Sequence, residues 1–204
     1  EGMWRGDFAR ISEAELPLPT GASETIQARV RRLDDDTQRA VRLAAVLGQE
    51  FDFELLDAVW GQGEEATLEA LDRLLRRRLI DEGTGVLARD YAFTHHKIRE
   101  VIYRGMSERH RQRIHGKAGL AMVHLYEPQV GDLAGELAVH FQEGARHDPA
   151  LRDRAIDFLV QAGDRARLTY AQKDAISYYE QALQLLRPEF RTLRPNRGQC
   201  KQAS

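Results

Sequence analysis

Cysteine is nearly absent from this chain of 204 residues, since Cys200 is the only one. A single cysteine cannot form a disulfide within the chain, which suits a reducing compartment. Long hydrophobic runs are also missing, because no apolar segment approaches the roughly 20 residues that cross a bilayer. The first ten residues lack the apolar stretch of a signal peptide. We therefore expect a cytoplasmic protein that contacts no membrane.

Neither charge is in excess: 30 Lys and Arg side chains stand against 32 Asp and Glu, a formal net charge of −2. A nucleic-acid-binding protein usually has a basic excess, so the balanced composition argues against a nucleic-acid partner. Hydrophobic residues make up 42% of the chain, which is enough to bury a core. The sequence begins with Glu1 rather than Met, so we expect it to be an excised part of a longer protein.

The two charges are nevertheless distributed unevenly. Residues 34–69 contain ten acidic and two basic side chains, whereas residues 97–117 contain seven basic and two acidic ones. One interpretation is that these are solvated helix faces. The other is that they form complementary surfaces that dock on each other or on a neighbouring domain.

Motifs of catalytic chemistry are missing as well. The sequence has no HExxH, no paired CxxC, no GxSxG and no P-loop. His95 and His96 are adjacent and would diverge by about 100° on a helix, while the five-residue spacing of His110 and His115 is also poor for one face. We therefore predict neither a metal site nor catalytic residues, and no enzyme, in this chain.

What the sequence does have is helical periodicity in its first half. Residues 1–22 read as a linker ending in "LPLPTGA", and Ser23 is a candidate N-cap of the helix that follows. Short turn signals separate the successive helices, and the leucines of the last one fall on one face. The predicted helices cover 23–33, 34–48, 51–61 and 64–80, the last with Leu68, Leu71, Leu74, Leu75 and Leu79 on its apolar face.

The period then changes. Residues 79–93, "LIDEGTGVLARDYAF", have a Gly-Thr-Gly turn between short apolar pieces and predict a β-hairpin. Helical periodicity returns with Thr94 as the expected N-cap. Three helices, a longer helix, a hairpin and a further helix is the order of a winged-helix domain, which we place at 23–106.

The remainder, 107–187, is predicted to be helical. Small residues at Gly163, Ala175 and Ala182, with Tyr179 among them, have the spacing of a tetratricopeptide repeat, in which two antiparallel helices approach closely. One match indicates only the beginning of an array. The predicted helices cover 107–126, 132–144, 150–169 and 172–186, and the tail 188–204 is expected to be disordered.

A basic cluster keeps DNA binding open as an alternative. Arg73, Arg76, Arg77 and Arg78 lie on the outer face of the predicted helix 64–80, which a winged helix can place in the major groove. No Asn or Gln stands among them to read adenine. Arginines on an outer face also suit salt bridges to a neighbouring domain, so contact with DNA and contact with another domain are both possible.

Several stretches together resemble a known family. The chain is similar to the region just after the nucleotide-binding core of bacterial signal-transduction ATPases with numerous domains, the STAND class, in which a P-loop ATPase is followed by a helical lid, a winged helix and a tetratricopeptide superhelix. The most specific stretch is the F-x-H-x-x-I-R-E-V-x-Y motif within "YAFTHHKIREVIYRGMSERHRQRIH". Its members here are Phe93, His95, Ile98, Arg99, Glu100, Val101 and Tyr103.

The resemblance implies a function without catalysis. Because the P-loop is absent, the chain would be the regulatory and protein-interaction part of an ATPase switch, with no cofactor of its own and with ADP or ATP bound by its parent protein. It would contact its own upstream ATPase domain and other proteins. The expected fold is all-α, with a winged helix that carries a small β-hairpin, followed by antiparallel helical hairpins of tetratricopeptide type.

The resemblance also implies a role for one histidine. In related switches, a His at the start of the helix after the wing contacts a phosphate of bound ADP, and the motif places this role on His95. The alternative is that His95 only caps its helix or packs against it. Arg99 and Glu100 are expected to anchor the wing by hydrogen bonds.

Overall fold

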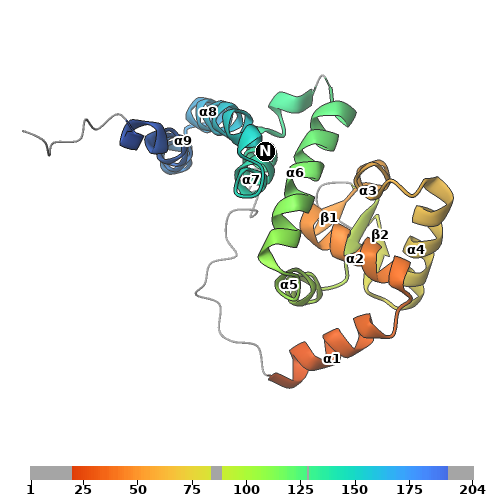
Figure 1. The fold of residues 1–204 in the computed structure, drawn as a ribbon. Helices are drawn as coiled ribbons and strands as arrows, with labels where there is room; N and C mark the ends of the chain where they lie inside the picture. Colours follow the sequence, from red (N-terminus) through yellow and green to blue (C-terminus); the bar gives the residue numbers. More distant parts are fainter. Residues whose placement is uncertain (1–19, 84–88, 128, 193–204) are drawn as a thin grey trace, which may run out of the picture.

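The computed structural model describes residues 20–83, 89–127 and 129–192. Within these ranges the chain forms nine α-helices, two short 3₁₀-helices and one small antiparallel sheet of three strands. The prediction of a mainly helical chain with a small hairpin is therefore confirmed. The sheet and its surrounding helices occupy one end of the molecule, and the later helices extend from it (Figure 1).

The first part of the chain holds four helices and the sheet. Asp34 caps the second helix, because its Oδ1 accepts the backbone N–H of Thr37 at 3.0 Å. Gly61 ends the third helix in the left-handed region, at φ 71°. The elements are α1 (Thr20–Arg31), α2 (Asp35–Leu47), β1 (Glu50–Phe51), α3 (Phe53–Trp60), α4 (Glu64–Arg76), β2 (Ile80–Glu82) and β3 (Tyr91–Phe93).

The sheet has the order β1-β3-β2, and both pairings are antiparallel. Ile80 lies opposite Phe93 in the predicted hairpin, whose tip, 84–88, falls outside the described residues. The two-residue strand β1 was not predicted, since it is too short to show alternation. Its Phe51 is fully buried and packs against Phe93, with ring centroids 6.0 Å apart.

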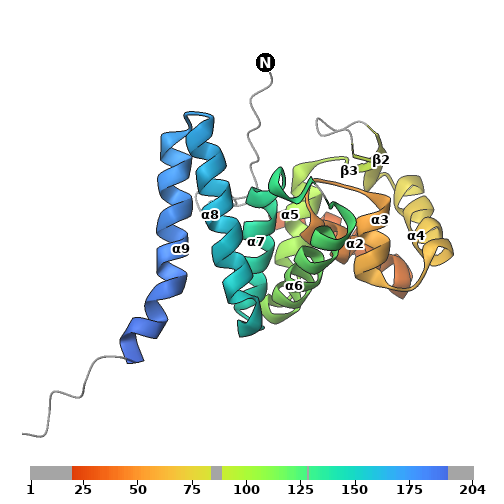
Figure 2. The same ribbon diagram turned by 90° about the horizontal axis from the view of Figure 1, so that it is seen from above.

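In the second part of the chain, every regular element of the described residues is a helix. Figure 2 shows its last four helices side by side, each packed against the next. Two 3₁₀ turns, Gln129–Gly131 and Pro149–Leu151, connect them. The helices are α5 (His96–Arg104), α6 (Glu108–Leu125), α7 (Ala134–Ala145), α8 (Arg152–Leu168) and α9 (Gln172–Thr192).

One hydrophobic core runs through both parts. Helix α6 packs on α2 and α3 on one side and on α7 on the other, so the core is continuous across the predicted boundary at residue 106. Burial of this apolar surface is the main force that holds the two parts together. The largest fully buried side chains include Phe51, Leu55, Leu56, Leu71, Leu74, Met122, Leu137, Phe141 and Leu159.

Several predicted boundaries were wrong. Helix α1 already begins at Thr20, within the expected linker 1–22. His95, not Thr94, occupies the N-cap of α5, and the Thr94 hydroxyl instead donates to the Arg78 carbonyl at 3.1 Å. Helix α9 runs past Pro188 to Thr192, where we expected disorder; the rest of the predicted tail lies outside the described residues.

The apolar face predicted for 64–80 also needs correction. Leu68 is 45% exposed. Leu79 is buried but lies beyond the end of α4, because Arg78 turns the chain at φ 51°. The Leu79 N–H bonds to the Leu74 carbonyl and the Arg78 N–H to the Leu75 carbonyl, which is the helix ending that usually has glycine at the Arg78 position.

The close approach predicted for the last two helices is confirmed. A Cβ added at Gly163 would lie 2.7 Å from a ring carbon of Tyr179, so only glycine leaves room for that ring. The Tyr179 hydroxyl donates to Asp164 at 2.7 Å. Ala175 and Ala182 are buried, as their small size suggested.

A second close approach, between α6 and α7, was not predicted. A Cβ on Gly144 would lie 2.7 Å from the Gly116 Cα. Because that neighbour is backbone, the helices would have to separate, and we expect Gly144→Ala to destabilise the fold by about 1–3 kcal/mol. Gly131→Ala is the control, since a Cβ there meets nothing within 4 Å. Equal urea midpoints for both variants would contradict the expectation.

Candidate functional site

The N-terminus of α5 is solvent-accessible. His95 is exposed, has an extended backbone at φ −145° and ψ 137°, and makes no side-chain capping hydrogen bond. Neither alternative role for its side chain, packing in the core or capping the helix, is therefore seen. His95 directly precedes the first backbone N–H groups of α5, which carry partial positive charge. This arrangement suits contact with an anion outside the chain.

The hydrogen bonds and ion pairs of Arg99 and Glu100 go to helices, and the tip of the hairpin, 84–88, lies outside the described residues, so their anchoring of the wing stays a prediction. The Arg99 Nε donates to the Ala45 carbonyl at 3.0 Å and thereby joins α5 to the end of α2. Glu100 pairs with Lys97 at 2.9 Å and with Arg104 at 2.8 Å, both on its own helix. The hydrogen bond from Lys97 is the chief reason that the pKa of Glu100 is lowered.

A buried polar chain runs from α5 through α6 to α7. The Tyr103 hydroxyl lies 3.0 Å from His115 Nε2, and His115 Nδ1 lies 3.0 Å from His140 Nδ1. Both imidazoles are buried. A hydrogen bond between two Nδ1 atoms needs one protonated and one unprotonated nitrogen, so the two rings cannot both be charged while it persists. Burial lowers the pKa of both histidines, that of His140 to about 4.

The sequence analysis missed the buried network of Tyr103, His115 and His140. His115 was compared only with His110, its neighbour along the sequence. Its partner, His140, is 25 residues away on another helix, and no sequence periodicity connects the two. A histidine at an otherwise apolar position of each helix was the available signal.

A second buried network joins the hairpin to α7. The Arg89 Nη2 lies 3.0 and 2.8 Å from the two carboxylate oxygens of Glu136, and Arg89 Nη1 lies 3.7 Å from Asp52. The Tyr126 hydroxyl donates to the same Asp52. Burial raises the pKa of Glu136, while the charge of Arg89 opposes that shift. The network thus joins four places in the fold: the segment before β3 (Arg89), the N-cap of α3 (Asp52), the C-cap of α6 (Tyr126) and helix α7 (Glu136).

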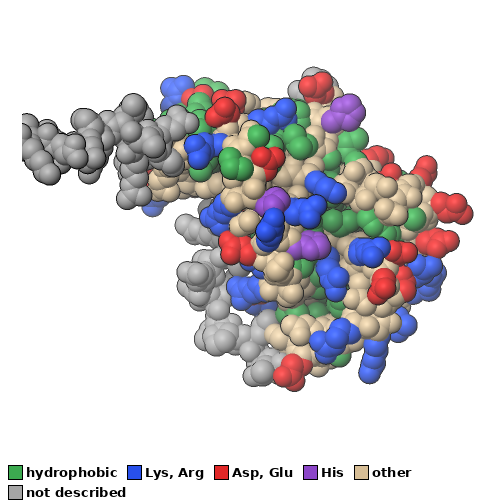
Figure 3. Space-filling view, viewed as in Figure 1, with side chains coloured by type: hydrophobic (Ala, Val, Ile, Leu, Met, Phe, Trp, Pro, Cys, Tyr) green, Lys and Arg blue, Asp and Glu red, His purple; other side chains and the backbone are tan. Residues whose placement is uncertain are grey.

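Two of the four predicted contact arginines are paired with acids of their own part of the molecule. Arg73 lies 2.8 Å from Glu69 and 3.5 Å from Asp34, and Arg76 lies 3.8 Å from Asp72. Figure 3 shows acidic and basic side chains interspersed at the end of the molecule that carries α4. The acidic segment thus finds local partners in these pairs, as expected of solvated helix faces.

The other two arginines end α4. Arg77 and Arg78 are both exposed, and no described carboxylate lies within ion-pairing distance of either. Their carbonyls accept hydrogen bonds from the Arg29 Nη2, at 2.6 and 3.3 Å. Arg29 therefore ties α1 to the end of α4 and adds a further positive charge there.

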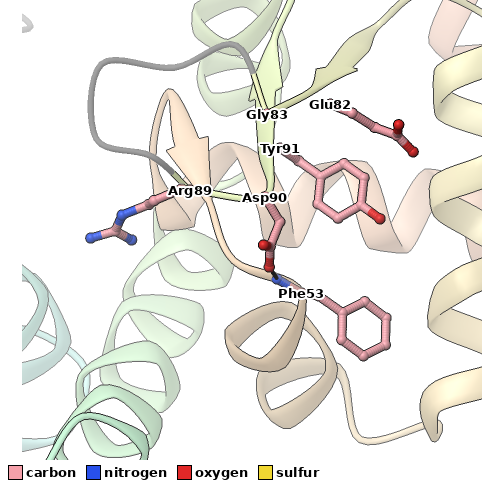
Figure 4. A pocket seen from close by; sticks show the side chains of 6 residues that line it. All are labelled: Phe53, Glu82, Gly83, Arg89, Asp90 and Tyr91. Atoms are coloured by element: carbon pink, nitrogen blue, oxygen red, sulfur yellow. Dashed lines mark hydrogen bonds between the residues drawn. The ribbon is translucent and has the colours of Figure 1, made fainter.

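A hollow of about 580 Å³ lies beside the hairpin (Figure 4). The rings of Phe53 and Tyr91 and the carboxylates of Glu82 and Asp90 surround it, while Arg89 points away from them. Asp90 is already occupied, since it accepts the Phe53 N–H at 2.9 Å. The sequence analysis did not point to this hollow, whose residues come from two separate segments.

The described residues contain neither a metal-binding cluster nor a membrane-spanning helix. In 20–83, 89–127 and 129–192, His, Cys, Asp and Glu side chains form no group of three or more that could hold a metal ion. No helix in that part of the chain has the length and apolar character to cross a membrane.

Comparison with known proteins adds one relative. An uncharacterized protein of Rhizobium meliloti (strain 1021) is 28% identical over 188 residues, which cover 88% of this chain and 17% of that protein. The chain therefore spans less than a fifth of the length of the curated relative that it matches. No family model matches the sequence, and no solved structure matches it.

Proposed function

We propose that this chain is a non-catalytic regulatory and protein-interaction module of a STAND-type ATPase signalling or transcriptional regulator, acting in the cytoplasm. The order of the elements supports a winged-helix assignment, because α2, β1, α3 and α4 are followed by the hairpin β2–β3. The close-packed pair α8 and α9 supports a tetratricopeptide-like assignment for the helical part. The much longer relative is consistent with a module of a larger protein.

The observation that carries this proposal is the exposed His95 at the start of α5. A neutral imidazole N–H donates a hydrogen bond to a phosphate oxygen, and the helix N-terminus favours the same negative charge. With ADP in an upstream ATPase domain, His95 would hold this module against that domain. Nucleotide exchange would release it.

The buried networks support transmission of this change. The helices α6 to α9 form the helical layer of the molecule. One network links α5 to this layer through Tyr103, His115 and His140, and the other links the hairpin to it through Arg89 and Glu136. A partner bound to the helical layer would therefore bias the docking of His95, provided that it binds the docked and released states with different affinity.

We expect His95→Ala in the full-length protein to release ADP about 10- to 100-fold faster than wild type. The reason is that a hydrogen bond to a charged group is worth about 1.5–3 kcal/mol. The measurement is the dissociation rate of a fluorescent ADP analogue after excess unlabelled ADP is added. His96→Ala is the matched control, since His96 is the exposed neighbour on the same turn, and it should leave the rate unchanged.

If the His95→Ala protein released ADP at the same rate as the wild type, this result would count against the phosphate contact. An equal acceleration by both variants would assign the effect to the helix end rather than to one imidazole. A full-length protein that binds no nucleotide would remove the proposed function as a whole.

DNA binding stays the second candidate because Arg77 and Arg78 are exposed at the end of α4. The outer face of that helix argues against it. Glu65, Glu69 and Asp72 are exposed along the preceding turns, where a helix in the major groove would bring them close to phosphates. Arginine alone at the end of α4 would have to offset that repulsion.

A further inference from the structure

The end of α4 and the turn between α1 and α2 enclose a hollow of about 400 Å³. His95, which carries the proposed phosphate contact, is not among its lining residues. Four guanidinium groups and one carboxylate line it. The lining residues are Arg32, Leu33, Asp34, Arg73, Arg76 and Arg77.

The one carboxylate of the hollow is already engaged. Asp34 accepts the Thr37 backbone N–H at 3.0 Å and the Thr37 hydroxyl at 2.8 Å. Arg73 lies 3.5 Å from Asp34 and is shared with Glu69. Asp34 therefore interacts with the start of α2 and with Arg73. It does not neutralise the other arginines of the hollow, which could interact with a ligand.

Those remaining arginines are weakly compensated. Of the carboxylates that the structure describes, only Asp72 pairs with Arg76, at 3.8 Å. No carboxylate in the described ranges lies within ion-pairing distance of Arg32 or Arg77. Arg29 adds a further guanidinium at the same end of α4, where it donates to the Arg77 carbonyl at 2.6 Å. Positive charge held in a concave surface concentrates the potential that an anion experiences.

We propose that this hollow binds a dianionic phosphate monoester group. Guanidinium groups match phosphate oxygens with paired hydrogen bonds. A dianion compensates the surplus of positive side chains better than a single carboxylate does. The monoester is favoured over a nucleic-acid duplex, because the acids Glu65, Glu69 and Asp72 on the neighbouring turns repel an extended polyanion.

The test is titration of the 204-residue chain with inorganic phosphate and with phosphoserine, followed by ³¹P and amide NMR in roughly 20 mM salt, where screening is weak. The double variant Arg32→Ala/Arg77→Ala should weaken the binding of both ligands at least tenfold. The matched control is Arg39→Ala/Arg146→Ala, which removes the same charge from two exposed arginines paired elsewhere. This control should keep most of the affinity.

The pH dependence identifies the charge state of the ligand. The second pKa of a phosphate monoester is about 6, so affinity should rise several-fold between pH 5 and pH 7. Glutamate, titrated as a carboxylate ligand, should bind more weakly and show no such rise.

Three results would overturn the proposal. Equal weakening by both double variants would mean general attraction by net charge, and no saturable phosphate binding would mean that the hollow is not a site. Tighter binding of a duplex DNA than of phosphoserine, lost in Arg32→Ala/Arg77→Ala and falling steeply with salt, would assign the arginines to nucleic acid. The ADP release rate of His95→Ala is independent of all three.

Discussion

Replacing Glu136 with alanine is expected to lower the free energy of unfolding by about 3–5 kcal/mol. Glu136 is buried and accepts two hydrogen bonds from Arg89, itself 9% exposed. Among the described carboxylates, its removal leaves the buried guanidinium with Asp52 alone, 3.7 Å away, so we expect the lower part of that range. The measurement is urea unfolding followed by far-UV circular dichroism at pH 7.

Two further variants separate loss of the pair from loss of the side chain. Glu143→Ala removes a half-exposed carboxylate from the same helix, paired with Arg146 at 3.3 Å, and should cost less than about 1 kcal/mol. Arg89→Met/Glu136→Leu removes both charges and should be far less harmful than Glu136→Ala, because neither member of the buried pair is left without the other and Asp52 keeps the hydrogen bond from Tyr126. If the double variant is as unstable as Glu136→Ala, burial of an unpaired charge is not the cause.

Stability is also expected to fall as the pH is lowered from about 6.5 to about 4. His140 has a pKa of about 4 in the folded chain, against about 6.5 when unfolded. In that interval the unfolded chain binds more protons than the folded one, so acid favours unfolding. The contribution of His140 to the free energy of unfolding is fully present above about pH 6.5, the pKa of an unfolded histidine. For His140 alone, the loss at pH 4 is about 3 kcal/mol.

The surroundings of His140 explain the direction of this shift. It is buried, and the charges of Arg89 and Arg99 also oppose its protonation. His115, at 3.0 Å, has its own pKa lowered by burial and by His140. A proton added to either ring therefore enters a site that already disfavours positive charge. The hydrogen bond between the two Nδ1 atoms also requires that one of the two rings stays unprotonated at Nδ1.

His140→Leu should flatten the pH dependence between pH 6.5 and pH 4, whatever its effect at neutral pH. His124→Gln is the control, since His124 is an exposed histidine of α6, and should leave the slope unchanged. The measurement is the urea midpoint at four pH values across the interval. An unchanged slope in His140→Leu would mean that other groups, such as paired carboxylates, cause the acid sensitivity.

The local features of the fold could be predicted because they depend on near neighbours in sequence. The periodicity of the chain located the helices within a few residues, and the Gly-Thr-Gly turn between short apolar pieces located the hairpin. Leu71 and Leu74 were predicted on the apolar face of the helix 64–80 from spacing, and both are buried. The spacing of Gly163 and Tyr179 likewise predicted a close approach of two helices, because that contact is made within one helical hairpin.

The details that failed depend on the ends of elements. Thr94 has the residue type of an N-cap, but its hydroxyl is used by the Arg78 carbonyl, which no local rule anticipates. Arg78 itself occupies a left-handed position that normally signals glycine. Leu79 was therefore assigned to a helix that had already ended.

By itself the sequence determined the helical class of this protein, the place of the hairpin and part of the apolar face of the helix 64–80, because apolar periodicity fixes which faces must be buried. Only the tertiary structure decided which polar residues meet inside. His115 with His140, and Arg89 with Glu136, are 25 and 47 positions apart in the sequence. Their pairing follows from how α6, α7 and the hairpin pack, since a buried polar group must find its partner wherever the packing places one.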